Sequence, residues 1–232
     1  MKKITAILLM LLMVCTPTYA ARVRFVQSQD RVLSVFGGSR ETEGFSYADL
    51  NGHWCAYTAR RLHEERILTG MQIGGQYYFF PDTLITRGEF LMTLMAVLHI
   101  GGAPYDSTVF ADHSSIADWL KPYAAAAYNA GIIKGDAAQG ALYLRPDDKI
   151  TRIEAICMLY NAVQPEGAEE TLPYTDRYLV PAWGEAPVSG LTAYGLLQGY
   201  EDGSVRPYVR MNRAMMGELL WQLAQYQAQE KK

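Results

Sequence analysis

One pattern occurs three times along the chain, and no other feature limits its fold as strongly. Each copy opens with an aromatic residue two positions before an aspartate, passes through a glycine, and reaches a proline and then an arginine. The most similar parts are ITRGE at Ile85–Glu89 and ITRIE at Ile150–Glu154. Equivalent positions lie 61 to 65 residues apart, and they are Asp49, Asp112 and Asp176; Gly70, Gly135 and Gly199; Pro81, Pro146 and Pro207; and Arg87, Arg152 and Arg213. We therefore expect three similar units.

Each copy has the pattern of a helix, a turn and a second helix. In the second copy the first helix is expected over 119–130, where Gly131 would end it. In the second helix of each copy, the positions 4, 7, 8 and 11 residues after the arginine form a stripe that is almost entirely apolar. The stripe consists of Leu91, Leu94, Met95 and Leu98; Ile156, Leu159, Tyr160 and Val163; and Gly217, Leu220, Trp221 and Ala224. One unit cannot bury its stripe alone, so the pattern predicts a core shared by all three.

The repeats also set the expected domain boundaries. Before them, two lysines precede an apolar run, and Thr18 and Ala20 suit cleavage after Ala20, which is the pattern of a secretory signal peptide. Cys15 raises the alternative of a lipoprotein, but Val14 is the wrong residue before it. The arm that follows suits either a short hairpin or a flexible segment. The expected segments are a signal peptide at 1–20, an N-terminal arm at 21–46, units at 47–100, 109–164 and 174–226, and a polar tail at 227–232.

Charge and composition exclude some classes of partner. Removal of the signal peptide would leave 19 of the 21 basic residues against 24 acidic ones, and this negative balance argues against binding to nucleic-acid phosphates. No later segment is long and apolar enough to cross a bilayer. Cys55 and Cys157 follow the signal peptide, and they either form a disulfide or serve as buried apolar residues. We expect an exported protein without a cofactor.

The TRxE stretches match the capping box of a helix N-terminus, in which the threonine accepts from a backbone amide and the glutamate reaches back to the cap. The pairs are Thr86 with Glu89 and Thr151 with Glu154. The third copy keeps Asn212 and Arg213 but has Met215 in place of the glutamate. If the site needs that carboxylate, the third copy is weakened or silent.

Capping does not explain the arginine that follows each cap. A cation in the first turn lies at the unfavourable end of the helix dipole. Its presence in all three copies predicts that it faces something negative, and free N–H groups, a positive helix end and a guanidinium together would form an anion site. The alternative is a salt bridge to a nearby acidic side chain. We predict Arg87 and Arg152 as the main anion contacts.

The ordered set of motifs resembles S-layer homology domains in three tandem copies. The set comprises the aromatic-x-Asp start, the tryptophan, AGIIKG at 130–135, YEDGSVRP at 200–207 and the ITRxE stretches, and it spans about Tyr47 to Ala224. Any one element is weak, whereas the whole set found three times is specific. The resemblance implies a mainly α fold, in which three helix-turn-helix repeats form a pseudo-threefold, three-pronged domain around a central helix bundle.

The resemblance also implies a ligand. Members of the family bind secondary cell-wall polysaccharide, typically its pyruvylated amino-sugar end, in grooves between the prongs, and a TRxE-type motif lines those grooves. The matching residues are Thr86, Arg87, Glu89, Thr151, Arg152, Glu154, Asn212 and Arg213. A pyruvyl ketal carries a carboxylate, which agrees with the anion site expected from the arginines. A location at the cell wall or cell surface follows from the same resemblance.

Other side chains near these motifs have either a structural or a binding role. The candidates for stacking on sugar faces are Tyr77, Tyr78, Tyr143, Tyr200 and Trp54. The tryptophans expected to pack between helices instead are Trp54, Trp119 and Trp183. The aspartates expected to cap the first helices or accept hydrogen bonds in their turns are Asp49, Asp112 and Asp176. Asp202 and Gly203 are expected to form a tight turn.

Two rival functions are an enzyme and a protein-binding adaptor. The sequence contains no nucleophile elbow or phosphate loop, and its histidines have no metal-ligand spacing, so catalysis is not expected. The histidines are His53, His63, His99 and His113. An adaptor that binds another surface protein remains the alternative to polysaccharide anchoring. Clustered exposed apolar residues in the third unit would favour the adaptor, whereas a groove with an arginine at its base would favour polysaccharide.

Overall fold

The computed structural model describes residues 45–104, 108–166 and 171–230. The elements of the first unit are η1 (Ala48–Leu50), α2 (Ala56–Glu64), β1 (Met71–Ile73), β2 (Gln76–Tyr78) and α3 (Arg87–Val97). Those of the second unit are η2 (His113–Ser115), α4 (Lys121–Asn129), β3 (Asp136–Ala138), β4 (Ala141–Tyr143) and α5 (Arg152–Val163). Those of the third unit are η3 (Arg177–Leu179), α6 (Ala182–Ala193) and α7 (Arg213–Glu230). The protein is mainly α, as predicted.

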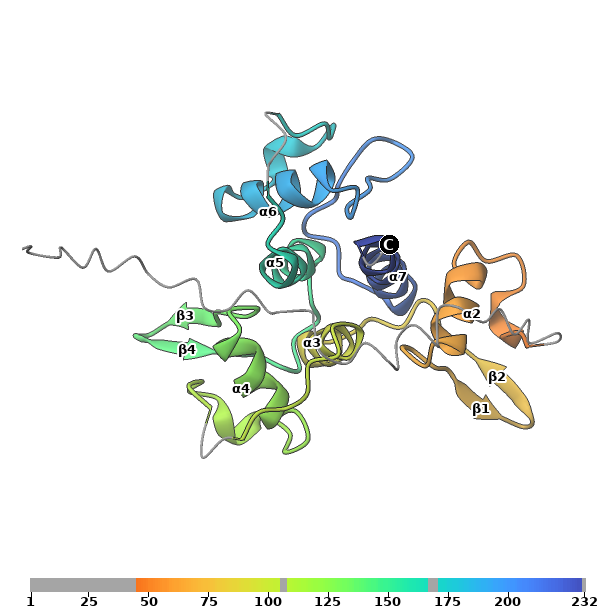
Figure 1. Ribbon diagram of the computed structural model, residues 1–232, viewed down its shortest axis with the longest axis horizontal. Helices are drawn as coiled ribbons and strands as arrows, with labels where there is room; N and C mark the ends of the chain where they lie inside the picture. The colour runs from red at the N-terminus through yellow and green to blue at the C-terminus, as the bar shows by residue number, and fades with distance from the viewer. Residues whose placement is uncertain (1–44, 105–107, 167–170, 231–232) are drawn as a thin grey trace, which may run out of the picture.

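Three prongs radiate from three central helices in the described part of the chain (Figure 1). The second helix of each unit, which is α3, α5 or α7, stands at the centre. The first helices α2, α4 and α6 lie outside them, and β1–β2 and β3–β4 form antiparallel hairpins at the edges of two prongs. The predicted three-pronged arrangement is therefore confirmed, while the two hairpins were not foreseen.

A closed ring of three backbone hydrogen bonds holds the centre together. Its members are Ile85, Ile150 and Met211, each two residues before the arginine of its unit and each almost fully buried. The amide of Ile85 donates to the carbonyl of Met211 at 3.0 Å, that of Met211 to Ile150 at 2.9 Å, and that of Ile150 to Ile85 at 3.2 Å. Every unit therefore donates once and accepts once, so all three are needed to satisfy these buried groups.

Each central helix packs against a prong that belongs to another unit. The helix α3 contacts α4 of the second unit, α5 contacts α6 of the third unit, and α7 returns to α2 of the first unit. The beginning and the end of the described chain therefore lie side by side, as Figure 1 shows for α2 and α7. Gly217 allows this contact, because a Cβ there would lie 3.1 Å from Leu62 of α2.

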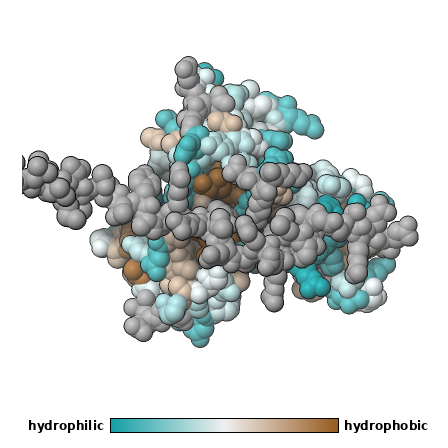
Figure 2. Space-filling model, in the orientation of Figure 1, coloured by the Kyte–Doolittle hydropathy of each residue, from teal (hydrophilic) through white to brown (hydrophobic). Residues whose placement is uncertain are grey.

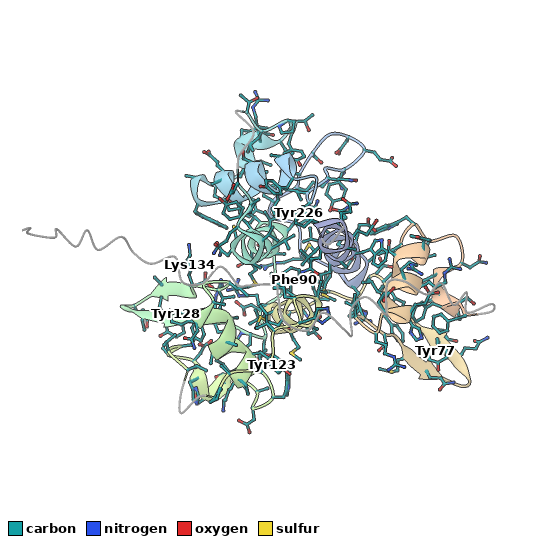
Figure 3. The ribbon with its side chains drawn as sticks, in the orientation of Figure 1. Tyr77, Phe90, Tyr123, Tyr128, Lys134 and Tyr226 are labelled. Carbon is teal, nitrogen blue, oxygen red and sulfur yellow. The ribbon has the colours of Figure 1, made fainter. Side chains whose placement is uncertain are left out.

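The predicted apolar stripes are buried, but partly against these prongs rather than against one another. Tyr160 of the α5 stripe lies over Gly190 of α6, where a Cβ on the glycine would come within 2.6 Å of the tyrosine ring. The centre of the bundle holds a position outside the stripe, three residues after each arginine. Figure 3 shows Phe90 there, and Ala155 and Met216 are equally buried. The shared core is therefore formed by both faces of each central helix. By contrast, the visible outer surface of the α2 prong is mostly hydrophilic (Figure 2).

The repeated aspartates tie the start of each unit to the turn before its central helix. Both carboxylate oxygens of Asp112 accept backbone hydrogen bonds, from Leu144 at 3.0 Å and Arg145 at 2.8 Å. Asp49 accepts from residues 79 and 80, and Asp176 from residues 205 and 206, in the same way. The prediction that they serve the first helices was wrong, because the backbone amides that donate to them lie about 30 residues further along the chain.

The tryptophan prediction was also wrong. Trp54, Trp119 and Trp183 are between 56% and 61% exposed, so they do not fill spaces between helices.

Cys55 is buried and Cys157 half-buried, and neither forms a disulfide. The turn at Asp202 is confirmed, because the amide and hydroxyl of Ser204 both donate to its carboxylate.

The predicted signal peptide at 1–20 and most of the arm at 21–46 lie outside the described residues. Within the described residues, no helix combines the length and hydropathy that a bilayer span requires.

We predict that Asp112→Ala lowers the free energy of unfolding by about 1–3 kcal/mol, because it leaves two backbone amides without their acceptor. Urea denaturation followed by circular dichroism measures this change. Asp118→Ala is the control, since Asp118 is exposed and pairs only with Lys121 at 2.7 Å, and it should leave the midpoint nearly unchanged. Equal losses for the two variants would contradict the role assigned to Asp112.

Candidate functional site

Both predicted capping boxes are present. The hydroxyl of Thr86 accepts from the amide of Glu89 at 3.1 Å, and the Glu89 carboxylate accepts from the amide of Thr86 at 2.7 Å. Thr151 and Glu154 make the same exchange at the start of α5. In the third unit, Asn212 accepts from the amide of Met215 at 2.9 Å, which is half of a box. These threonines and glutamates therefore define where the central helices begin.

The expected free amides at these helix starts are not free. The amides of Arg87 and Gly88 donate to carbonyls of Asp148 and Pro146 in the second unit, at 2.9 and 2.8 Å. Arg152 and Arg213 donate in the same way to carbonyls of the third and first units. The third amide of each helix donates to the capping side chain. None of the first three backbone amides of a central helix is therefore free to bind a ligand. The proposal of an anion held by helix-end amides is therefore wrong, and any anion contact depends on side chains.

The three arginine side chains also reach into the unit that follows around the ring. We call these contacts the first junction (Arg87 with the second unit), the second junction (Arg152 with the third unit) and the third junction (Arg213 with the first unit). Arg87 is only 6% and Arg152 only 9% exposed. The sequence pattern indicated an arginine with a negative partner at each position, but the three junctions differ.

At the first junction, Arg87 is satisfied by protein groups. Its Nε donates to the carbonyl of Leu144 at 3.0 Å. Its terminal nitrogens form ion pairs with Glu154 at 3.1 Å and with Asp136 at 3.2 Å. Arg145 binds the same two carboxylates, at 3.3 and 2.7 Å. The salt-bridge alternative is therefore correct for Arg87.

At the third junction, Arg213 is held mainly by carbonyl groups. Its Nε donates to Phe79 at 2.8 Å and its Nη2 to Thr69 at 3.1 Å. The guanidinium also lies 5.0 Å from the centre of the Phe79 ring. Burial lowers the pKa of Arg213, and the charge of Glu89 acts in the opposite direction without an ion pair.

At the second junction, Arg152 has the fewest partners. Its Nη2 donates to the carbonyl of Gln198 at 2.7 Å. Its Nε is buried and has no hydrogen-bond partner among the described residues, although the equivalent atoms of Arg87 and Arg213 both have one. No carboxylate of the described chain lies within ion-pair distance of it. Burial lowers the pKa of Arg152, and the charge of Asp176 acts in the opposite direction without an ion pair among the described residues.

Tyr200 forms one wall of the second junction. Its ring lies 5.2 Å from the Arg152 guanidinium and 4.0 Å from that of Arg206. Arg206 is about half exposed and pairs with Asp202 at 2.7 Å. Of the proposed stacking tyrosines, Tyr200 is thus the one beside a buried arginine. Tyr77 packs on His63 and Phe45 instead, and Tyr78 stacks on Phe80.

Sequence reasoning missed the residues that distinguish the junctions. They occupy two positions that recur in each unit. The residue after the repeated glycine is Met71, Asp136 or Tyr200, and the residue before the repeated proline is Phe80, Arg145 or Arg206. The repeat alignment was sufficient to place them in register. It gave no sign that Asp136 contacts Arg87 or that Tyr200 contacts Arg152, since these contacts depend on how the units close.

We predict that the ion pairs of Glu154 make stability depend on pH. Burial by itself would raise its pKa, but the hydrogen bonds from Thr151 and the charges of Arg87 and Arg145 outweigh this, so the pKa of Glu154 lies below its ordinary value. The stabilisation is therefore present above the unfolded-state pKa of about 4.3 and is lost as pH falls through the folded-state value. Thermal melts from pH 7 to pH 3 should show a shallower decline for Glu154→Gln. The exposed Glu201→Gln variant should keep the wild-type slope, and a Glu154→Gln slope equal to wild type would refute the prediction.

Comparison with known proteins places the chain among surface proteins. It is 27% identical over 183 residues to an amylopullulanase of Thermoanaerobacterium thermosulfurigenes, which covers 77% of this chain and 9% of the relative. It is 26% identical over 181 residues to the S-layer protein EA1 of Bacillus anthracis, covering 76% and 20%. An endo-1,4-beta-xylanase A of Thermoanaerobacterium saccharolyticum is 33% identical over 112 residues, covering 48% and 9%. The chain thus spans a fifth or less of the length of each of these three relatives.

The family model for the S-layer homology domain matches residues 109–156 and 173–214. These two matches cover α4 and the start of α5 in the second unit, and α6 and the start of α7 in the third. They include Arg152 at the second junction and Arg213 at the third. These two segments of the chain are therefore S-layer homology domains.

Proposed function

We propose that this protein anchors to the cell surface by binding secondary cell-wall polysaccharide, through the anionic, pyruvylated ends of that polymer. The ligand-binding residues proposed are the eight of the repeated motif, namely Thr86, Arg87, Glu89, Thr151, Arg152, Glu154, Asn212 and Arg213. The two S-layer homology domains and the surface-layer relatives support the anchoring role. The enzyme names among the relatives belong to proteins of which this chain matches only a small part.

The observation that carries the proposal is the state of Arg152. A guanidinium that is nine-tenths buried, has no carboxylate partner and leaves its Nε without an acceptor suits an external carboxylate. The ring of Tyr200 lies 5.2 Å from it, and Arg206, which lies 4.0 Å from the same ring, adds a second cation to the junction. A sugar that carries a carboxylate matches these three features, because its ring can stack and its charge can pair.

We also propose that residues 47–100 are a third S-layer homology unit. The region has the same order of a short helix, a longer helix, a hairpin and a central helix as the second unit. It contains a complete capping box at Thr86 and the aspartate link from Asp49. Thr69 and Phe79, on either side of its hairpin, provide the carbonyls that bind Arg213, so the third unit depends on it.

A second candidate function is a protein-binding adaptor, which one observation favours. The third unit exposes Tyr178 at 80%, Trp183 at 59% and Leu179 at 44%, all within six residues. Apolar residues that gather on one surface are common at protein interfaces. In this case the chain would remain at the cell surface through a partner protein.

Co-sedimentation with cell-wall sacculi distinguishes the two functions. One portion of sacculi keeps its secondary polymer and a second is stripped of it by acid. Polysaccharide anchoring predicts that the protein pellets with the intact sacculi alone. Pelleting with both portions, or with neither, would contradict it, and the latter would leave the adaptor as the better function.

We predict that Arg152→Gln weakens binding to intact sacculi by about 10- to 100-fold, because one charge-assisted contact to a carboxylate is lost. Glutamine can still donate a hydrogen bond toward the Gln198 carbonyl, so the fold should persist, and a thermal melt checks this. The exposed Arg177→Gln variant removes the same charge away from the junctions and should bind as wild type does. Equal binding by a folded Arg152→Gln variant would exclude Arg152 as the anion contact.

A further inference from the structure

The three junctions present the same arginine with three different sets of neighbours. Two positions determine the neighbours of each arginine side chain. They are the residue after the repeated glycine and the third residue of the central helix. At the first junction both are acidic, Asp136 and Glu154, and both form ion pairs with Arg87. At the second junction neither is acidic, since Tyr200 and Met215 occupy the two positions. At the third junction they are Met71 and Glu89.

The acidic pair at the first junction does what a ligand carboxylate would do. Asp136 and Glu154 form ion pairs with the terminal nitrogens of Arg87, and the carbonyl of Leu144 accepts a hydrogen bond from its Nε. Arg145 neutralises the same two carboxylates from the other side. An external carboxylate would have to displace two internal ones that the fold already holds in place, so it would gain little.

The second junction differs because the third unit lacks the capping glutamate. Met215 stands where Glu154 stands in the second unit, and its sulfur lies 3.9 Å from the hydroxyl of Tyr200. The missing carboxylate leaves the Arg152 side chain with one hydrogen bond to the residues that the structure describes, through Nη2. The departure from the motif in the third unit therefore frees the arginine of the second unit.

The third junction is intermediate and closed mainly by carbonyl groups. Both Nε and Nη2 of Arg213 have backbone acceptors. Phe80 and Met71 replace the polar residues found at the other two junctions. This junction offers no polar group beside its arginine of the kind that Arg206 provides.

We propose that the chain binds one carboxylate-bearing sugar, at the second junction, and that Met215 is the residue that selects this junction. Asp136 and Glu154 act as internal carboxylates that close the first junction. This inference rests on the proposed polysaccharide function and adds to it the number of working sites and the residue that sets that number.

The first experiment is isothermal titration of the full chain with the methyl glycoside of a pyruvylated N-acetyl amino sugar. The same glycoside without the pyruvyl ketal is the control ligand. One site per chain is expected for the first and none for the second. Two or three equivalent sites would overturn the inference and leave the proposed function intact. No binding of the glycoside together with no binding to intact sacculi would overturn both.

The second experiment uses a matched pair of variants at position 215. Met215→Glu would complete the capping box with Asn212 and place a carboxylate against Arg152, as Glu154 lies against Arg87 at 3.1 Å. We expect at least a tenfold loss of affinity for the pyruvylated glycoside. Met215→Gln has the same shape without the charge and should bind within about threefold of wild type. Equal affinities for the two variants would overturn the role of Met215.

The third experiment opens the first junction. The double variant Asp136→Asn with Glu154→Gln keeps the shapes of both side chains and removes both charges. We expect titration to show two sites per chain instead of one, with the second site weaker. Thermal melts identify any loss of folding, and a well-folded double variant that still binds a single glycoside would show that the internal carboxylates do not close this junction.

Discussion

The structure depends on a ring of backbone hydrogen bonds that no unit can form alone. Ile85, Ile150 and Met211 each donate to one neighbour and accept from the other at the buried centre of the molecule. A missing unit would leave one amide and one carbonyl without partners in an apolar environment, which is costly. The same closure places each central helix against the prong of another unit, including α7 against α2. Three copies are therefore the smallest number that satisfies both the polar groups and the apolar stripes.

The closure also explains why the arginines are found at the starts of the central helices. Their backbone amides bind carbonyls of the next unit, and their side chains follow them into the junctions. An arginine at this position therefore holds two units together. The acidity of two neighbouring positions determines whether it is paired with a carboxylate of the protein. Arg87 is paired with Asp136 and Glu154, whereas no carboxylate of the described residues forms an ion pair with Arg152.

Much of the fold could be predicted because its signals are local. The capping boxes of Thr86 and Thr151 follow from residues three apart, and the helix stripes follow from the helical period. The expectation of free amides at the helix ends failed because the carbonyls that bind them lie in another unit. The tryptophans were misplaced for a related reason. A large apolar residue at the start of a helix gives no indication of which side faces the neighbouring unit, and Trp54 faces solvent.

The sequence by itself determined that there are three units, where each central helix begins, and which arginine follows each cap, because repeats, caps and stripes act over a few residues. It also indicated the S-layer homology domains that the family model matches at residues 109–156 and 173–214, since the motifs that carry the resemblance are short and ordered. Only the tertiary structure decided what each arginine meets. The partners of Arg87, Arg152 and Arg213 lie 46 to 144 residues away in the chain, and ring closure alone brings them together. A junction is made from two units, so its chemistry cannot be read from the motif of either one.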